Sequence, residues 1–428
     1  MENPFSLDKV LALGVDPHRE SLDAVAIRFP EEILLDESFE NGRAGHHTLW
    51  SRANALAAEH DLALVIGLED GSNYGYPLGR YLTEQGCSVK EVNPRKTNRQ
   101  RDFYGQDKTN RLDALATAAI VFRAYDQLPD IVPVHEALEA TRALSRYREQ
   151  LVKEQTASIN RLHSHLAIHY PAYKTFFSKV NGVTALHFWT NYPTPRHLQT
   201  VSPQDLANFF YDKSNHRLGA EASRKKADKI LQLLDDSPVQ NLLLLAEANE
   251  MIISDLARRL LQLKRSIDAL ETKLEVTLRA TGQQVHTFSG ISTVLAAVLV
   301  GETQDPARFK HSKDHFASYN GTAPATRGTG KHVRHVENRW CNRRLKSALD
   351  RVALNARRSE PLSAQYYQAC LDRGLDPGQA HKCLMRRLSD VVFAMIRDKS
   401  AYDPATHHRK QMLHKKKGKS AAPAVSDG

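Results

Sequence analysis

Short apolar runs near the N-terminus constrain the fold of this chain more than any other feature. Val10–Asp16 and Leu62–Glu69 are brief, almost wholly apolar, and each ends in a carboxylate. Both predict buried β-strands, and Ala24–Phe29 predicts the second strand of a hairpin with the first. A helical segment at Pro77–Gly86 and a further strand at Ser88–Pro94 complete an α/β pattern. Because ligand sites in such sheets lie at strand carboxyl ends, we expect the two acids at one edge.

A third acid, Asp113, stands at the head of the Ala-rich stretch Ala114–Ala119, which predicts a helix. Each acid alone is compatible with an ordinary turn or cap. Their order is more specific, because acids on a first strand, a later central strand and a following helix are the RNase H-like arrangement. Clustered carboxylates repel one another unless a hard cation neutralises them, so the pattern predicts bound Mg²⁺ and phosphoryl transfer on nucleic acid.

Composition narrows the class of protein. The 428 residues leave room for two or three domains, and the net charge of +10 favours a polyanionic partner. The four cysteines form no Cys-x-x-Cys pair, which predicts neither a disulfide framework nor a thiolate zinc site. The N-terminus has no signal-peptide core, and the apolar stretch Val294–Val300 is too short to cross a bilayer. We therefore expect a cytoplasmic protein with no membrane partner.

The middle of the chain has the clearest periodicity. Residues 134–170 have a helical pattern that stops at Pro171, and a less regular segment follows to about Pro203. Apolar positions then alternate spacings of three and four at Val239, Leu242, Ala246, Asn249, Ile253, Leu256, Leu260, Leu263, Ile267, Leu270 and Leu274. This regularity predicts a coiled coil, in which Asn249 would fix register or oligomeric state. The alternative is one helix of an intramolecular bundle.

A second group of polar residues lies in Tyr319–Lys331 and Asn338–Leu345. Glycines on both sides of Thr329 would let its backbone and hydroxyl approach a phosphate closely. Positive charge for that phosphate would come from Lys331, Arg334, Arg339, Arg343 and Arg344. From spacing alone, a flexible basic loop without chemistry explains the segment better.

Three weaker patterns accompany these groups. The segment Arg95–Arg101 predicts a basic loop that grips a nucleic-acid backbone, with a solvated surface loop as the alternative. Its cations, with one nearby lysine, are Arg95, Lys96, Arg99, Arg101 and Lys108. The Gly-containing turn after Phe288 is similar to a helix-hairpin-helix turn. His163, His165 and His169 have no acid or cysteine nearby, which favours a solvated or RNA-facing surface over a metal site.

Together, the acids and the Thr329 segment resemble the DEDD transposases of the insertion-sequence family numbered 110, which are bridge-RNA-guided DNA recombinases. The order and spacing of several short motifs carry the resemblance: Gly14–Asp16, Leu68–Glu69 with Gly75, Val92–Pro94, Lys108–Ala114, Phe288–Ile291, Arg308–Phe309, Gly321–Pro324, Thr329–Lys331 and Asn342–Leu345. It implies a RuvC-like, RNase H-like domain at residues 1–130 and a helical coiled-coil domain at 131–284. A mostly α-helical C-terminal transposase domain at 285–400 and a disordered basic tail at 401–428 would follow.

The resemblance also implies roles for individual residues. The four acids of the family fall on Asp16, Glu69, Asn110 and Asp113, so position 110 departs from the family's aspartate. Thr329 holds the place of the nucleophilic serine. The implied reaction is attack of this hydroxyl on a DNA phosphate, giving a covalent protein–DNA intermediate at an Mg²⁺-dependent composite site shared between subunits. The implied partners are a guide RNA, target and donor DNA, and further copies of the chain in a dimer or tetramer.

Both departures bear on activity. An asparagine carbonyl still ligates Mg²⁺ but lacks the charge that holds two ions, and Asp107 lies one helical turn before Asn110 to compensate in part. Threonine is a competent but hindered nucleophile, because its β-methyl group restricts χ1. A coordinated variant of the family is favoured over decay, since the surrounding motifs are intact. Two alternatives stay open: a RuvC-like structure-selective endonuclease that uses water, and a weakened RNA/DNA-binding descendant.

Overall fold

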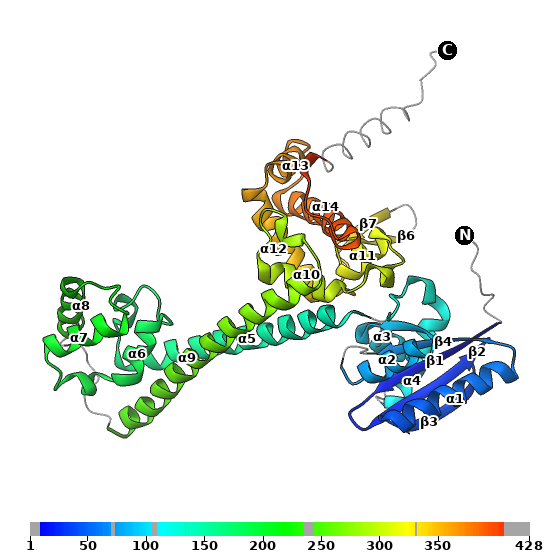
Figure 1. Cartoon of the computed structure of the whole chain (residues 1–428), viewed down its shortest axis with the longest axis horizontal. Helices are drawn as coiled ribbons and strands as arrows, with labels where there is room; N and C mark the ends of the chain where they lie inside the picture. The colour runs from blue at the N-terminus through cyan, green and yellow to red at the C-terminus, as the bar shows by residue number, and fades with distance from the viewer. Residues whose placement is uncertain are drawn as a thin grey trace, which may run out of the picture. The chain divides into compact units, whose positions relative to one another are not determined.

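The computed structural model divides the chain into two compact units (Figure 1). Unit 1 comprises Met1–Arg142 and Thr277–Gly428, and unit 2 comprises Ala143–Val276. The structure describes residues 9–69, 73–104, 109–132, 134–234, 243–329 and 332–405, with only the backbone of 243, 326–329 and 332–335. The predicted basic tail therefore lies, beyond residue 405, outside the described residues. The predicted domain boundaries at residues 130 and 284 stay predictions.

A five-stranded sheet forms the N-terminal part of unit 1. Its strands are β1 (Val10–Pro17), β2 (Ser21–Arg28), β3 (Glu32–Glu40), β4 (Ala63–Glu69) and β5 (Ser88–Val92). The order is β3-β2-β1-β4-β5, with β1 antiparallel to β2 and parallel to β4. The predicted hairpin and the two acid-terminated strands are thus confirmed. The last predicted strand is shorter than expected, because Pro94 begins a helix.

Strand β3 was not predicted from the sequence, and its position in the sheet explains why. It is the edge strand beside β2, and of its nine residues only Leu35 is buried. An edge strand with acidic residues lacks the apolar alternation by which strands are found in sequence. Helix α1 (Arg43–Glu59) follows it and was also missed, although Leu49, Ala53 and Ala57 repeat every four residues on its buried side.

Helices cover both faces of the sheet. Alternate residues of β1 point to opposite faces, so Leu11, Leu13 and Val15 pack in one core and Val10 and Ala12 in another. The first core also receives α1 and α2 (Tyr76–Glu84), and the second receives α4 (Asn110–Ala124). The prediction of a helix headed by Asp113 is confirmed, since Asp113 lies in the first turn of α4.

The basic segment Arg95–Arg101 is a helix, and its prediction as a loop was wrong. Helix α3 (Pro94–Arg101) begins where the Asn93 side-chain oxygen accepts a hydrogen bond of 3.0 Å from the Arg95 amide. Proline at the first helical position adds a preset backbone angle. Cap and proline therefore outweigh the strongly polar composition of the segment, which alone indicates a loop.

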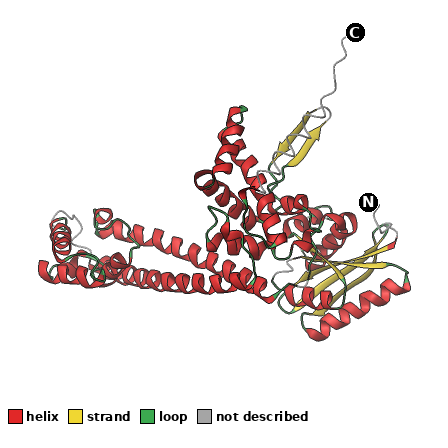
Figure 2. Cartoon of the chain, turned by 45° about the horizontal axis from the view of Figure 1, so that its top comes forward, coloured by secondary structure: helices red, strands yellow, loops and turns green. Residues whose placement is uncertain are grey.

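The C-terminal part of unit 1 is helical around its own core. Its elements are α10 (Thr293–Thr303), η6 (Pro306–Phe309), α11 (Lys313–Asn320), α12 (Arg343–Ser359), α13 (Pro361–Asp372) and α14 (Pro377–Asp398). The core of this part reaches Ile396. A two-stranded sheet, β6 (Ala325–Thr329) and β7 (His332–Val336), replaces the predicted basic loop (Figure 2).

Unit 2 contains most of two long helices, α5 (Glu136–His169) and α9 (Leu243–Ala280). They run antiparallel, because Arg148 pairs with Glu271 and His165 bonds Asn249. Seam residues of α9 pack against α5 and a core of aromatic residues in α6 (Val183–Asn191) and α7 (Pro203–Lys213). The heptad pattern is thus satisfied within the chain, as the bundle alternative predicts. Among the described helices, none is apolar over a bilayer-spanning length.

Candidate active site

Strand register brings the first two predicted acids together. Strands β1 and β4 are parallel neighbours in which Val15 lies opposite Leu68, so the next residues, Asp16 and Glu69, are adjacent at the carboxyl ends. Both side chains point to the face that α4 covers, because each follows a glycine of that face by two residues. The expected acid edge of the sheet is therefore present.

Contact between α4 and β1 brings Asp113 to the same edge. A Cβ atom on Gly14 would overlap the carbonyl oxygen of Ala114 and the amide nitrogen of Ala118. The backbone of α4 thus lies directly on β1, and only glycine permits that approach. Asp113 immediately precedes Ala114 and faces the end of β1. Asp16 and Asp113 are 8% and 7% exposed, so both carboxylates are removed from bulk water.

The surroundings of Glu69 disfavour its negatively charged form. Burial, and then the negative charges of Asp16 and Asp113, raise the pKa of Glu69 to about 8. A hydrogen bond with Thr97 and the positive charge of Arg101 only partly oppose this rise. The Oε2 atom of Glu69 is buried and has no hydrogen-bond partner within the described part of the chain. Such an orphaned carboxylate oxygen is a free ligand position.

Two basic side chains contact the other acids. The Arg101 guanidinium forms an ion pair with Asp113, and its side chain is 14% exposed. The His18 Nε2 atom lies 3.1 Å from Asp16 Oδ2, and burial raises the pKa of Asp16 although His18 opposes the rise. Arg101 therefore points into the acid cluster, which its place in a basic segment did not predict. Thr97, His18 and this role of Arg101 are the site features that the sequence reasoning missed.

The site has the donor chemistry of a hard divalent cation. Its ligand atoms are carboxylate oxygens, which Mg²⁺ prefers. Within the described residues, however, no three His, Cys, Asp or Glu side chains are already arranged to hold an ion. The Asp113 carboxylate is paired with Arg101 instead. Asn110 is exposed at the start of α4, one turn before Asp113, and Asp107 lies outside the described residues.

The predicted nucleophile lies in the C-terminal part of unit 1. Thr329 is the last residue of β6 and pairs with His332 across the two-stranded sheet. The described structure gives its backbone only, so its hydroxyl is not placed relative to the acids. The same limit applies to Arg334, and Lys108 and Lys331 lie outside the described residues.

The other predicted cations gather from two distant segments. The Asn342 side-chain oxygen caps α12 by accepting bonds from the Arg344 and Leu345 amides, so Arg343 and Arg344 stand exposed in its first turn. The Arg95 Nη1 atom donates to the Arg339 carbonyl at 3.3 Å, which joins α3 to this motif. Two other cations of α3 differ in setting, since Arg99 is exposed whereas burial lowers the pKa of Lys96.

The predicted histidine group is structural in this chain. His163 bonds the Tyr173 hydroxyl at 2.8 Å, and His165 bonds Asn249 at 2.6 Å. His169 is buried, and burial lowers its pKa. These contacts favour packing within unit 2 over the solvated surface that was predicted for these histidines.

Comparisons with known proteins agree with this geometry. Residues 13–171 match a transposase family model, and residues 282–368 match the model of the transposase IS116/IS110/IS902 family. An uncharacterized 43.6 kDa protein of insertion element IS110 from Streptomyces coelicolor is 25% identical over 91% of this chain and 95% of its own. An uncharacterized 44.8 kDa protein of IS116 from Streptomyces clavuligerus is 28% identical, over 92% and 93%. The two family models together match more than half of the sequence, and the chain is a transposase of the IS110 family.

Proposed function

We propose that this transposase is an RNA-guided DNA recombinase with an RNase H-like acid site and a threonine nucleophile. The convergence of Asp16, Glu69 and Asp113 at one sheet edge is the observation that carries the proposal. Its partners would be a guide RNA, target and donor DNA, and further copies of the chain in a dimer or tetramer. The strand order β3-β2-β1-β4-β5, with only β2 antiparallel to its neighbours, supports the RNase H-like, RuvC-like assignment.

Mg²⁺ fits the acid site, and the orphaned Oε2 atom of Glu69 supports that fit. Asp16, Glu69 and Asp113 would hold the ion, with Asn110 or Asp107 assisting. When bound, Mg²⁺ would neutralise charge that develops on the phosphate oxygens. Residues around the acids would orient them: Thr97 holds Glu69, and Arg101, released from Asp113, would face the phosphate backbone.

The proposed chemical step is a transesterification. The Thr329 oxygen forms a bond to phosphorus, and one backbone phosphorus–oxygen bond breaks. The threonine proton passes to water, and the departing DNA oxygen takes up a proton from water and becomes a hydroxyl. The product is a covalent protein–DNA ester, so the number of phosphodiester bonds is conserved and strand exchange needs no external energy source. The exposed Arg343 and Arg344 would hold the phosphates near this step.

The test is formation of a denaturation-resistant protein–DNA adduct in the presence of Mg²⁺, guide RNA and both DNAs. We expect Thr329→Ala to abolish the adduct, because no hydroxyl remains, and Thr329→Ser to retain it. Asp16→Asn should lower adduct formation by at least about a hundredfold without changing RNA binding. An adduct formed equally well by Thr329→Ala would refute the nucleophile assignment.

The presence of asparagine at position 110 favours the two alternative functions, a water-using endonuclease and a descendant without catalysis. Asn110 replaces a family aspartate and lies exposed at the start of α4, so it adds no charge to the site. A water-using endonuclease would release ends with a free 5′-phosphate and no attached protein. A descendant without catalysis would bind guide RNA tightly yet exchange no strands with Mg²⁺ or Mn²⁺. In the second case, Asn110→Asp is expected to restore activity.

A further inference from the structure

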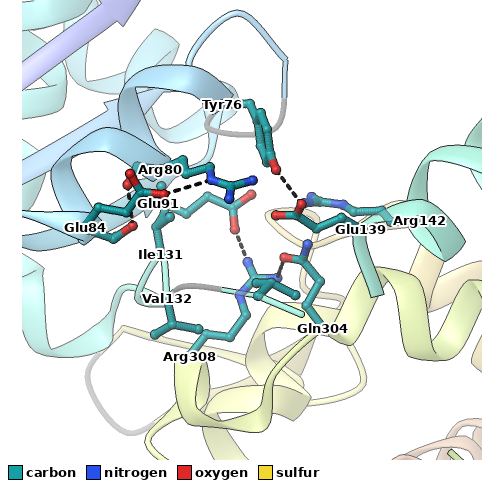
Figure 3. Close-up of a pocket in the computed structure, with 12 residues that line it drawn as sticks. Tyr76, Arg80, Glu84, Glu91, Ile131, Val132, Glu139, Arg142, Gln304 and Arg308 are labelled. Atoms are coloured by element: carbon teal, nitrogen blue, oxygen red, sulfur yellow. Dashed lines mark hydrogen bonds and ion pairs between the residues drawn. The ribbon is translucent and has the colours of Figure 1, made fainter. Parts of the chain in front are cut away.

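A buried arginine connects the sheet of unit 1 to its C-terminal helical part (Figure 3). Arg308, in η6, is 3% exposed, and its guanidinium forms an ion pair with Glu91 of β5. It also donates a hydrogen bond of 3.0 Å to Gln304. The Arg308 carbonyl accepts a bond of 3.0 Å from the amide of Asp130, which lies along β5. Side chain and backbone of one residue thus both hold the same edge of the sheet.

On the sheet, Glu91 lies next to the acid site. It pairs with Leu68 across β4 and β5, one residue before Glu69. Two residues beyond it, Asn93 caps α3, the helix that brings Thr97 and Arg101 to the acids. A displacement of β5 would therefore also move α3, and with it Thr97 and Arg101, which contact the acids.

On the helical side, the contacts of Arg308 lead to the basic motif at the start of α12. Its guanidinium lies 5.3 Å from the ring centre of Tyr319, whose hydroxyl accepts a bond of 3.2 Å from Asn342 Nδ2. The oxygen of the same Asn342 side chain accepts the Arg344 and Leu345 amides. The bond to Tyr319 thus helps to orient the Asn342 side-chain amide, and the oxygen of that amide caps α12.

We propose that Arg308 is a positioning residue that holds the acid edge and the start of α12 in one fixed arrangement. A buried ion pair gives little net stability compared with apolar residues of the same volume, and in some proteins it serves to specify a single geometry. The significance of that geometry for DNA chemistry rests on the proposed function. The positioning role itself concerns the free protein and needs no nucleic acid or metal.

Hydrogen exchange of the full-length chain, followed by mass spectrometry, tests the proposal. Glu91→Gln removes the charge from the sheet side while keeping size and shape. We expect it to raise amide exchange at least tenfold in residues 344–345, across the network, as well as in residues 130–131. Exchange in Val183–Asn191 of unit 2 should stay unchanged. Arg308→Lys, which keeps the charge but loses the planar fork, should give a smaller rise at the same two places.

Glu84→Gln is the matched control, because Glu84 lines the same cavity as Glu91 and Arg308 but pairs with Arg80 within α2. It should leave exchange at both places at the wild-type rate. The proposal fails if Glu91→Gln raises exchange only beside β5. It also fails if Glu91→Gln and Glu84→Gln give the same exchange rates, since the ion pair of Arg308 would then have no positioning effect. If Glu91→Gln does not fold, the Arg308→Lys result decides by the same criteria. These outcomes do not depend on adduct formation, so the two proposals can fail separately.

Discussion

The acid edge of the sheet and the basic start of α12 differ in how their charged side chains are placed and in how far they are exposed. The acids come from three separate segments, are mostly buried, and are placed by strand register and by a helix lying on Gly14. The cations Arg343 and Arg344 are adjacent in sequence, exposed, and placed by the single cap residue Asn342. A metal site needs preorganised ligands shielded from water, whereas phosphate contacts need reach and exposure. Burial of the acid side chains therefore lowers the stability of the fold, whereas the exposed cations have no such cost.

The largest effect is expected from a substitution that separates the backbones of α4 and β1 at the acid edge. Gly14→Ala places a methyl group against the backbone of α4, which cannot yield as a flexible side chain would. We expect a loss of about 3 kcal/mol in the free energy of unfolding, measured by denaturant titration. Adduct formation should fall with it, because Asp113 moves away from Asp16. Gly219→Ala, where no atom lies within 4 Å of the added carbon, should change the free energy of unfolding by less than about 1 kcal/mol, the cost of a weaker helix cap, and should leave adduct formation unchanged. Equal stability of the two variants would contradict the packing argument.

A second prediction concerns pH and the buried charge of Glu69. Because the folded pKa is about 8 and the ordinary value is 4.5, the folded chain holds a proton between these values that the unfolded chain has lost. Stability of the metal-free chain should therefore fall as pH rises from about 5 to 8.5, by at most about 5 kcal/mol from this residue. Glu69→Gln should remove that part of the dependence, and the exposed-site variant Glu84→Gln should keep it.

Addition and removal of metal sharpen the same prediction. On the proposed function Mg²⁺ would bind the Glu69 carboxylate and displace its proton, so it should raise the thermal midpoint more at pH 8.5 than at pH 6. Chelation should reverse the gain. A gain of equal size at both pH values, or an equal gain in Glu69→Gln, would exclude Glu69 as a ligand.

The smallest expected effect lies on the basic side of the comparison. Arg343→Ala with Arg344→Ala should leave stability within about 0.5 kcal/mol, since both side chains are exposed. DNA affinity should fall several-fold at low salt, and the slope of log affinity against log salt should decrease by about 2. Asn342→Ala should act on affinity and also destabilise α12 by about 1 kcal/mol through loss of its cap. An unchanged salt slope in the double variant would place the phosphate contacts elsewhere.

Sequence reasoning succeeded where the signal is local. The strands that end at Asp16 and Glu69, the helix headed by Asp113, and the long helix that stops before Pro171 all follow from short-range patterns. It failed for β3, an acidic edge strand, and for α3, where a cap and a proline override polar composition. The heptad pattern of α9 predicted a helix and its buried face, but periodicity cannot tell an intramolecular partner from another chain.

The sequence by itself determined which chemical groups this transposase carries: three acids at element ends, the substituted Asn110 and Thr329, and a run of cations. Only the tertiary structure decided how those groups meet. Register places Asp16 beside Glu69, close contact at Gly14 brings in Asp113, and Arg101 turns inward to pair with it. Arg308 shows the same division, because no local pattern pairs it with Glu91, more than two hundred residues away. Composition and periodicity act along the chain, whereas charge pairing and close packing depend on distances that folding alone creates.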